Sequence, residues 1–176
     1  MNTKTNRVPD VKGFSLVEVM VAMLILLISL GALLSMFTLA VGDNANQGES
    51  ATRTTEFAQD KMEQLLALSF TDGSTDTTVF PPATTGGTGL GGTMAASSTV
   101  GGTNPAAPVA SYVDYLSPAG ALLTSSSGAF YAREWSISTD STAKLKTVTV
   151  FVRALKSLGP GATPSTTLVC IKTNNT

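Results

Sequence analysis

The 176 residues suffice for one modest domain and an additional N-terminal segment. The formal net charge is −1, which provides no global positive field for binding nucleic acid. There is no histidine, and Cys170 is the only cysteine. The composition therefore excludes histidine acid–base catalysis, an intramolecular disulfide and most zinc sites, and Cys170 is predicted to be a small buried hydrophobic residue.

The first 13 residues form a short basic segment. Lys4, Arg7 and Lys12 stand against the single acid Asp10, which gives a net side-chain charge of +2 (3 − 1). A basic segment in front of an apolar helix predicts that this end of the chain stays in the cytoplasm.

A long apolar stretch follows, and residues 19–42 contain no charged side chain. As a helix this stretch is about 36 Å long, enough to cross a hydrocarbon core of about 30 Å. No proline occurs between Pro9 and Pro81. We expect one long helix with a weak point between Gly42 and Gly48, because glycine has a low helix propensity.

Glu18 interrupts the start of this stretch, within "KGFSLVEVMVAMLILL", and three interpretations compete to explain it. A secretory signal peptide, cut near Ala40 or Gly42, has a shorter apolar core than this one. A plain membrane anchor explains the length of the stretch but not the glutamate. Cleavage after Gly13 explains both features, because it creates an ammonium group at Phe14, four residues before Glu18.

The third interpretation gives Glu18 a partner. A carboxylate in the apolar core costs about 2.5–3.5 kcal/mol on insertion scales. The ammonium of a neighbouring subunit at the same depth would offset this cost and fix the register between two helices. The simpler alternative is that Glu18 reaches back to the membrane surface.

The residues "KGFSLVEVMVAMLIL" resemble the class III leader and N-terminal helix of type IV pilins and type II secretion pseudopilins. The resemblance implies that a prepilin peptidase cuts after Gly13, that Phe14 is the N-methylated first residue, and that Glu18 serves subunit assembly. It also implies a type IV pilin-like α+β fold, in which the C-terminal half of the long helix packs on an antiparallel sheet of three to four strands.

The helix is predicted to continue as an amphipathic helix over residues 43–70. One stripe is apolar, and the charged residues Arg53, Glu56, Asp60, Lys61 and Glu63 are expected largely elsewhere. The stretch "EFAQDKMEQL" also resembles minor pilins of the PilV type. The residues of the apolar stripe are Ala58, Met62, Leu65, Leu66 and Ser69.

Residues 71–110 are rich in glycine, threonine and proline and are predicted to form an irregular, mobile loop that buries little. The sequence "GGTGLGG" lacks the strand and helix context of a phosphate-binding loop. Asp72 and Asp76 are candidate calcium ligands, but two acids in such a loop are usually solvated.

Residues 111–176 are predicted to form the sheet of a small head. Three strands are expected at 129–139, 144–157 and 166–173, with 111–116 as a candidate fourth, and short connections favour antiparallel neighbours. Val148, Val150 and Val152 should share one face of the second strand. Tyr131, Trp135 and Ile137 should share a face of the first, with Arg133 among them.

The function that the resemblance implies is structural: a minor pilin of a type IV pilus, in the complex that primes assembly or forms the tip. Its implied partners are other minor pilins and the major pilin, the prepilin peptidase, the inner-membrane assembly platform and a tip adhesin. The implied location is the bacterial inner membrane before assembly and the cell surface afterwards.

Two alternatives remain open at this point. One is a minor pseudopilin of a type II secretion system, and the other is a membrane-tethered extracytoplasmic binding domain or enzyme. The sequence predicts no catalytic residues, no cofactor, no metal site and no nucleic-acid partner.

Overall fold

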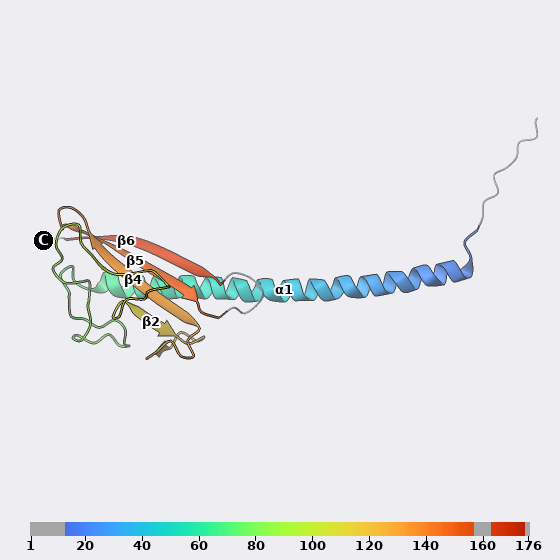
Figure 1. Cartoon of the computed structure of the whole chain (residues 1–176), viewed down its shortest axis with the longest axis horizontal. Helices are drawn as coiled ribbons and strands as arrows, with labels where there is room; N and C mark the ends of the chain where they lie inside the picture. The colour runs from blue at the N-terminus through green and yellow to red at the C-terminus, as the bar shows by residue number, and fades with distance from the viewer. Residues whose placement is uncertain (1–12, 157–162, 175–176) are drawn as a thin grey trace, which may run out of the picture. The chain divides into compact units, whose positions relative to one another are not determined.

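The computed structural model describes residues 13–156 and 163–174. It contains one helix, α1 (Leu16–Ala67), followed by six strands (Figure 1). The chain divides into two compact units, residues 1–42 and 43–176, and we call the second unit the head. The strands are β1 (Thr99–Gly101), β2 (Val113–Leu116), β3 (Leu122–Leu123), β4 (Tyr131–Thr139), β5 (Leu145–Ala154) and β6 (Ser165–Thr173).

Helix α1 is unbroken between Gly42 and Gly48, so the expected weak point does not interrupt the helix. In the first unit the large apolar side chains of α1 are all exposed, for example Leu26 at 66% and Phe37 at 67%. Among the residues that the structure describes, none buries these apolar side chains.

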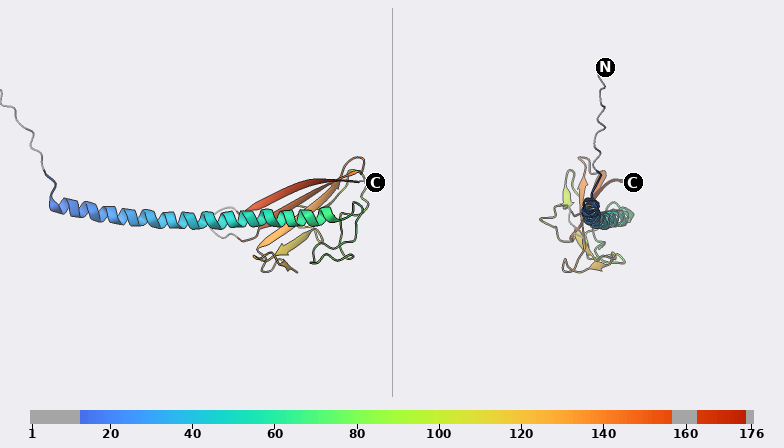
Figure 2. Two further views of the ribbon diagram at one scale, coloured as in Figure 1. Left: turned by 180° about the vertical axis from the view of Figure 1, so that it is seen from behind. Right: turned by 90° about the vertical axis from the view of Figure 1, so that its right-hand side faces the viewer.

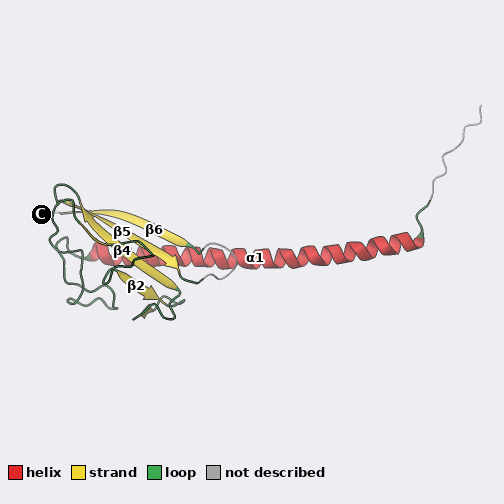
Figure 3. Ribbon diagram, viewed as in Figure 1, coloured by secondary structure: helices red, strands yellow, loops and turns green. Residues whose placement is uncertain are grey.

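The head contains one antiparallel sheet in the order β3-β2-β4-β5-β6, and β1 also pairs with β4 (Figure 3). The predicted meander of three long strands is confirmed, and the candidate strand at 111–116 is present as β2. The sheet has six strands rather than three to four. The two additional strands, β1 and β3, are only three and two residues long and exist because they pair with β4 and β2.

The core of the head lies between α1 and the inner face of the sheet, with β4, β5 and β6 running alongside the helix (Figure 2). Val148, Val150 and Val152 are fully buried on one face of β5, as predicted. The ring of Phe57 on α1 meets that of Tyr131 on β4 edge-on, with 5.1 Å between centroids. Aromatic and branched side chains on the two elements therefore bury each other.

The face that α1 turns to the sheet differs from the predicted stripe in two places. Ser69 is exposed and follows the end of the helix at Ala67, whereas Lys61, expected among the solvated charges, is completely buried. The lysine lies one turn from Phe57 and Leu65, both of which are also buried, so helical periodicity placed it on the inner face. The face of α1 that packs on the sheet therefore contains a buried charged side chain as well as apolar ones.

The glycine-rich segment after α1 is mostly irregular, as predicted, but the expectation that it buries little is wrong. Leu90 is fully buried and Thr77 nearly so. Lys146 of β5 holds the segment from inside, since its ammonium group donates hydrogen bonds to the carbonyl oxygens of Phe70, Leu90 and Gly92 at 2.6–2.7 Å. A strand side chain thus anchors a loop whose own composition offers little to bury.

Strand β1 lies inside this segment, where the sequence predicted no strand. Its last residue, Gly101, has φ +74°, and a Cβ there would lie 2.4 Å from the carbonyl oxygen of Trp135. Only glycine accepts both the backbone angle and the close approach. At least one glycine of this segment, Gly101, is therefore needed for β1 to pack closely against β4.

Candidate processing and assembly site

The junction predicted to be cut lies just before α1. Gly13 and Phe14 precede the helix, and the Phe14 ring is 82% exposed. A Cβ on Gly13 would meet no atom within 4 Å, so the fold itself gives no steric reason for a glycine there. An exposed, non-helical junction is accessible to a processing enzyme.

Glu18 lies in the first turn of α1 and is the only acid there. The first backbone bond of the turn runs from the Val19 N–H to the Ser15 carbonyl oxygen, at 3.2 Å. A serine suits the position before a helix, and a carboxylate in the first turn is stabilised by the free N–H groups and the helix dipole.

Phe14 and Glu18 are brought to the same side of the chain. Together with Ala22, one turn further on, they line a shallow, largely apolar hollow. The helical repeat places residues four apart on one face, so an approaching chain would contact the aromatic ring and the carboxylate together. The remaining residues of this hollow are Val19, Met23 and Leu26.

Helix α1 is long and apolar enough to cross a membrane. Its most apolar stretch of 18 residues has a mean hydropathy of 2.6 and is not buried within the protein. Burying this surface is favourable, so a bilayer or neighbouring helices are expected to cover it.

A group of charged side chains in the head joins α1 to the sheet. Arg133 of β4 donates two hydrogen bonds to the carboxylate of Asp114 on β2, at 2.7 and 2.9 Å. Lys61 of α1 donates to the same carboxylate at 3.0 Å, and Asp60 accepts from Arg133 at 2.7 Å. We call Lys61, Asp114 and Arg133 the buried charge cluster, and the exposed Asp60 pairs with Arg133 from its edge.

The surroundings of Lys61 disfavour its charge. Burial lowers the pKa of the Lys61 ammonium to about 8, against the opposing attraction of Asp114. The ammonium lies 3.7 Å from the centroid of the Trp135 ring and also donates to the Thr77 carbonyl oxygen at 2.6 Å. A buried cation is stable only when its hydrogen bonds are made, and Lys61 makes them to Thr77 and Asp114. These contacts are those of a structural ion pair.

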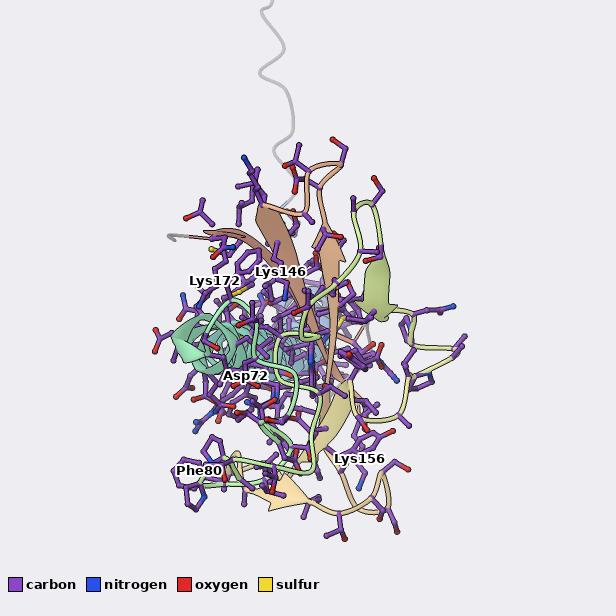
Figure 4. All side chains as sticks on the ribbon, turned by 90° about the vertical axis from the view of Figure 1, so that its left-hand side faces the viewer. Asp72, Phe80, Lys146, Lys156 and Lys172 are labelled. Atoms are coloured by element: carbon purple, nitrogen blue, oxygen red, sulfur yellow. The ribbon has the colours of Figure 1, made fainter. Side chains whose placement is uncertain are left out.

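Two more lysines, Lys146 and Lys172, lie near the end of α1 and bond to main-chain carbonyl oxygens (Figure 4). Lys172 of β6 donates to the carbonyl oxygens of Leu66 and Leu68, while Lys146 bonds to the three carbonyls described above. The last turn of α1 has no basic residue of its own. Lys172 therefore supplies the positive charge that a helix C-terminus favours.

Sequence analysis missed these lysine contacts, although a signal was present. Lys146 lies on the same face of β5 as the inward valines, and Lys172 lies on the same face of β6 as Leu168 and Cys170. A lysine in phase with buried residues of a strand points inward and needs acceptors. Cys170 is partly rather than fully buried, because β6 lies at the edge of the sheet.

Asp72 and Asp76 take part in two separate turns. The Asp72 carboxylate accepts from the N–H groups of Ser74 and Thr75, and that of Asp76 accepts from the N–H of Thr78 at 2.8 Å. Such contacts are typical of aspartate-capped turns. Over the residues that the structure describes, no group of three or more acidic, histidine or cysteine side chains is arranged to hold a metal ion.

Comparison with protein families finds the prokaryotic N-terminal methylation motif over residues 9–34. The matched residues include Gly13, Phe14 and Glu18. No significant match was found to a curated protein or to a solved structure.

The long N-terminal apolar helix and the antiparallel sheet on which its later part packs form an α+β, pilin-like architecture. The chain carries the prokaryotic N-terminal methylation motif, which supports its assignment to the type IV pilin and pseudopilin family. The motif points to a structural protein, anchored in a membrane and then incorporated with other pilins after processing by a prepilin peptidase.

Proposed function

We propose that the chain is a minor pilin of a type IV pilus, in the complex that primes assembly or forms the tip. A prepilin peptidase cuts between Gly13 and Phe14 and methylates the new N-terminus. Glu18 then accepts the ammonium group of a neighbouring subunit and sets the axial register of the two helices. The observation that carries this proposal is the methylation motif at the start of an exposed apolar helix.

The geometry at the helix start supports the role of Glu18. Its carboxylate shares one face with Phe14, beside a largely apolar hollow. In hydrocarbon a lone carboxylate is costly, and a partner ammonium would offset part of this cost. The basic residues of the first 13 support a cytoplasmic N-terminus before assembly.

The PilV-type assignment is supported by where the resembling residues lie. Lys61 and Met62 of "EFAQDKMEQL" are buried in the head, and the Lys61 ammonium lies over the ring of Trp135 on β4. The resemblance therefore falls on residues that join the helix to the sheet, rather than on scattered surface positions.

Mass spectrometry of the mature protein tests the processing step. We expect loss of residues 1–13 and a methylated Phe14 at the N-terminus, and Gly13→Ala should leave unprocessed protein in the membrane. An intact leader, or cleavage after Ala40 or Gly42, would contradict the proposal.

Glu18→Val tests the assembly step, with Ser15→Ala as a nearby control. We expect the Glu18 variant to be processed and inserted normally but to be lost from sheared filaments, since its carboxylate cannot pair. Wild-type piliation in this variant would rule out the register role.

Deletion of the gene separates the two assemblies that use this architecture. A minor pilin predicts loss or reduction of pili, whereas a minor pseudopilin of a type II secretion system predicts loss of protein export. Normal piliation with defective export would replace the proposed function with the second one.

A further inference from the structure

Strand β6 forms one edge of the sheet and has β5 as its only neighbouring strand among the described residues. Two backbone bonds flank the β5–β6 pair, from the Ala154 N–H to the Pro164 carbonyl oxygen and from the Asn174 N–H to the Lys144 carbonyl oxygen. All four residues are even-numbered. In an antiparallel pair bonded residues alternate, so the even-numbered residues of β6 bond to β5.

The backbone groups of the odd-numbered residues therefore point away from the sheet. Thr167, Val169 and Ile171 each present an N–H and a carbonyl group along this outer edge. Within residues 13–156 and 163–174, no other backbone group bonds to them. We call these three residues the open edge.

The open edge lacks the features that usually protect an edge strand from pairing. Strand β6 is nine residues long, contains no proline, and pairs with β5 residue by residue without a bulge. Its only charged residue is Lys172, whose ammonium group is turned inward to the end of α1. Proteins normally blunt such edges with outward lysines, prolines or bulges.

Exposed apolar side chains accompany these backbone groups. Val169 is 62% exposed and Ile171 is 60% exposed, and both are β-branched. An added strand with apolar or β-branched residues opposite them would gain favourable cross-strand contacts. Since β6 carries no outward charge, the matching strand is expected to be uncharged at these positions.

We propose that the open edge is a docking site for an extended strand of a partner subunit, which pairs antiparallel with β6 and lengthens the sheet. This inference rests on the proposed function, because the partner is a subunit of the same assembly. An extended strand is the occupant that the edge selects, because its backbone repeats donors and acceptors at the spacing of alternate β6 residues.

The orientation of β6 favours a different element over a second copy of β6. Thr166 bonds to Thr54 early in this part of α1, and Lys172 bonds to Leu66 near its end, so β6 and α1 run in the same direction. Subunits of one filament share one orientation under its helical symmetry. Their β6 strands would run parallel, so an antiparallel partner must come from another segment.

Val169→Pro tests the pairing, with Val169→Ala as the matched control. Proline removes the outward N–H of residue 169 but none of the bonds to β5, whereas alanine trims the side chain and keeps the N–H. In the native host we expect Val169→Pro to lower the amount of this chain in sheared filaments about tenfold, as the loss of a pairing bond implies, and Val169→Ala to stay near wild type.

Protection of the Leu168 and Cys170 amides from hydrogen exchange reports whether the β5–β6 ladder survives in the proline variant. If the β5–β6 ladder is lost in Val169→Pro, the variant Val169→Lys is used as the test instead, with Thr149→Lys as its control. Thr149 lies opposite Val169 on the same face of the sheet but on the interior strand β5. A loss of incorporation with Val169→Lys alone supports docking at the edge, and an equal loss with both overturns it.

The results separate this inference from the proposed function. If Glu18→Val is lost from filaments but the folded Val169→Pro variant assembles like wild type, docking at the open edge is wrong and the proposed function stands. If the wild-type chain is itself absent from sheared filaments, the proposed function fails and the inference fails with it. A photo-crosslinker at Thr167 that joins this chain to another subunit supports the inference, and one that joins two copies of this chain overturns it.

Discussion

The two parts of the molecule treat charge and apolar surface in opposite ways. In the first unit, the large apolar side chains are exposed, and Glu18, the only acid of residues 13–42, lies exposed at the start of the helix. In the head, apolar side chains are buried and the charges of Lys61, Asp114 and Arg133 are buried with them. The first unit thus exposes side chains that can contact other molecules, while the head buries and pairs its apolar and charged side chains internally.

This difference predicts that substitutions in the two parts will separate cleanly. Changes in the head should lower its free energy of unfolding, and similar changes in the first unit should affect insertion or assembly only. Trp135 is the only tryptophan and lies in the core of the head. Its fluorescence in urea, measured on the full chain in detergent, therefore reports on the head alone.

The largest effect is expected when a buried carboxylate is neutralised. Asp114→Asn removes the negative charge that faces both Lys61 and Arg133, and we expect the free energy of unfolding to fall by about 3–5 kcal/mol. Glu18→Gln, the same chemical change in the first unit, should leave the urea midpoint unchanged. Equal midpoints for the two variants would contradict the comparison.

A slightly smaller effect is expected from trimming a leucine on each part of α1. Leu65 is fully buried, so Leu65→Ala should cost about 2–5 kcal/mol through lost burial and the cavity left behind. Leu26 is 66% exposed, and Leu26→Ala should leave the unfolding of the head unchanged. A shift of similar size at Leu26 would mean that the first unit stabilises the head.

Removal of the lysine at the end of α1 should have an intermediate effect. Lys172→Met keeps the length of the side chain but leaves the carbonyl oxygens of Leu66 and Leu68 without their charged donor. Hydrogen bonds from a charged group contribute about 1.5–3 kcal/mol, and we expect a loss in that range. Lys144→Met, at an exposed position, is the control and should change the midpoint little.

The effect of pH is the smallest of these when it is counted per pH unit. The pKa of Lys61 is about 8 in the folded protein and near 10.5 when unfolded, so between these values the unfolded chain binds more protons. The free energy of unfolding contributed by Lys61 should therefore rise with pH in this window, by at most about 1.4 kcal/mol per pH unit. Lys61→Met should lack this rise in urea titrations from pH 7 to 10, and an identical slope in both proteins would refute the burial of charge.

Much of the fold follows from local sequence pattern. The apolar run of residues 19–42 and the alternation of Val148, Val150 and Val152 predict the helix and the inner face of the sheet, because each pattern matches the repeat of one regular structure. The residues proposed for processing and assembly, Gly13, Phe14 and Glu18, lie close together in one short stretch of sequence. Such local signals need no knowledge of distant contacts.

The parts that sequence analysis missed depend on distant contacts. Strand β3 has two residues and exists only because Leu122 and Leu123 pair with β2. Lys61 resembles an ordinary surface lysine until Asp114 is placed beside it, 53 residues along the chain. Leu90 is buried because the segment around it is held by Lys146 of β5. None of these partners is near in sequence, so no local pattern predicts these contacts.

The ammonium group of Lys146 has a consequence for the glycine-rich segment that it holds. Its three acceptors are main-chain carbonyl oxygens, at Phe70, Leu90 and Gly92, and every amino acid carries such an oxygen. The Lys146 contacts therefore depend on the position of the backbone and not on the identity of the side chains. The exposed tips of the segment are accordingly free to accept foreign sequences or peptide tags, provided that these three carbonyls keep their positions.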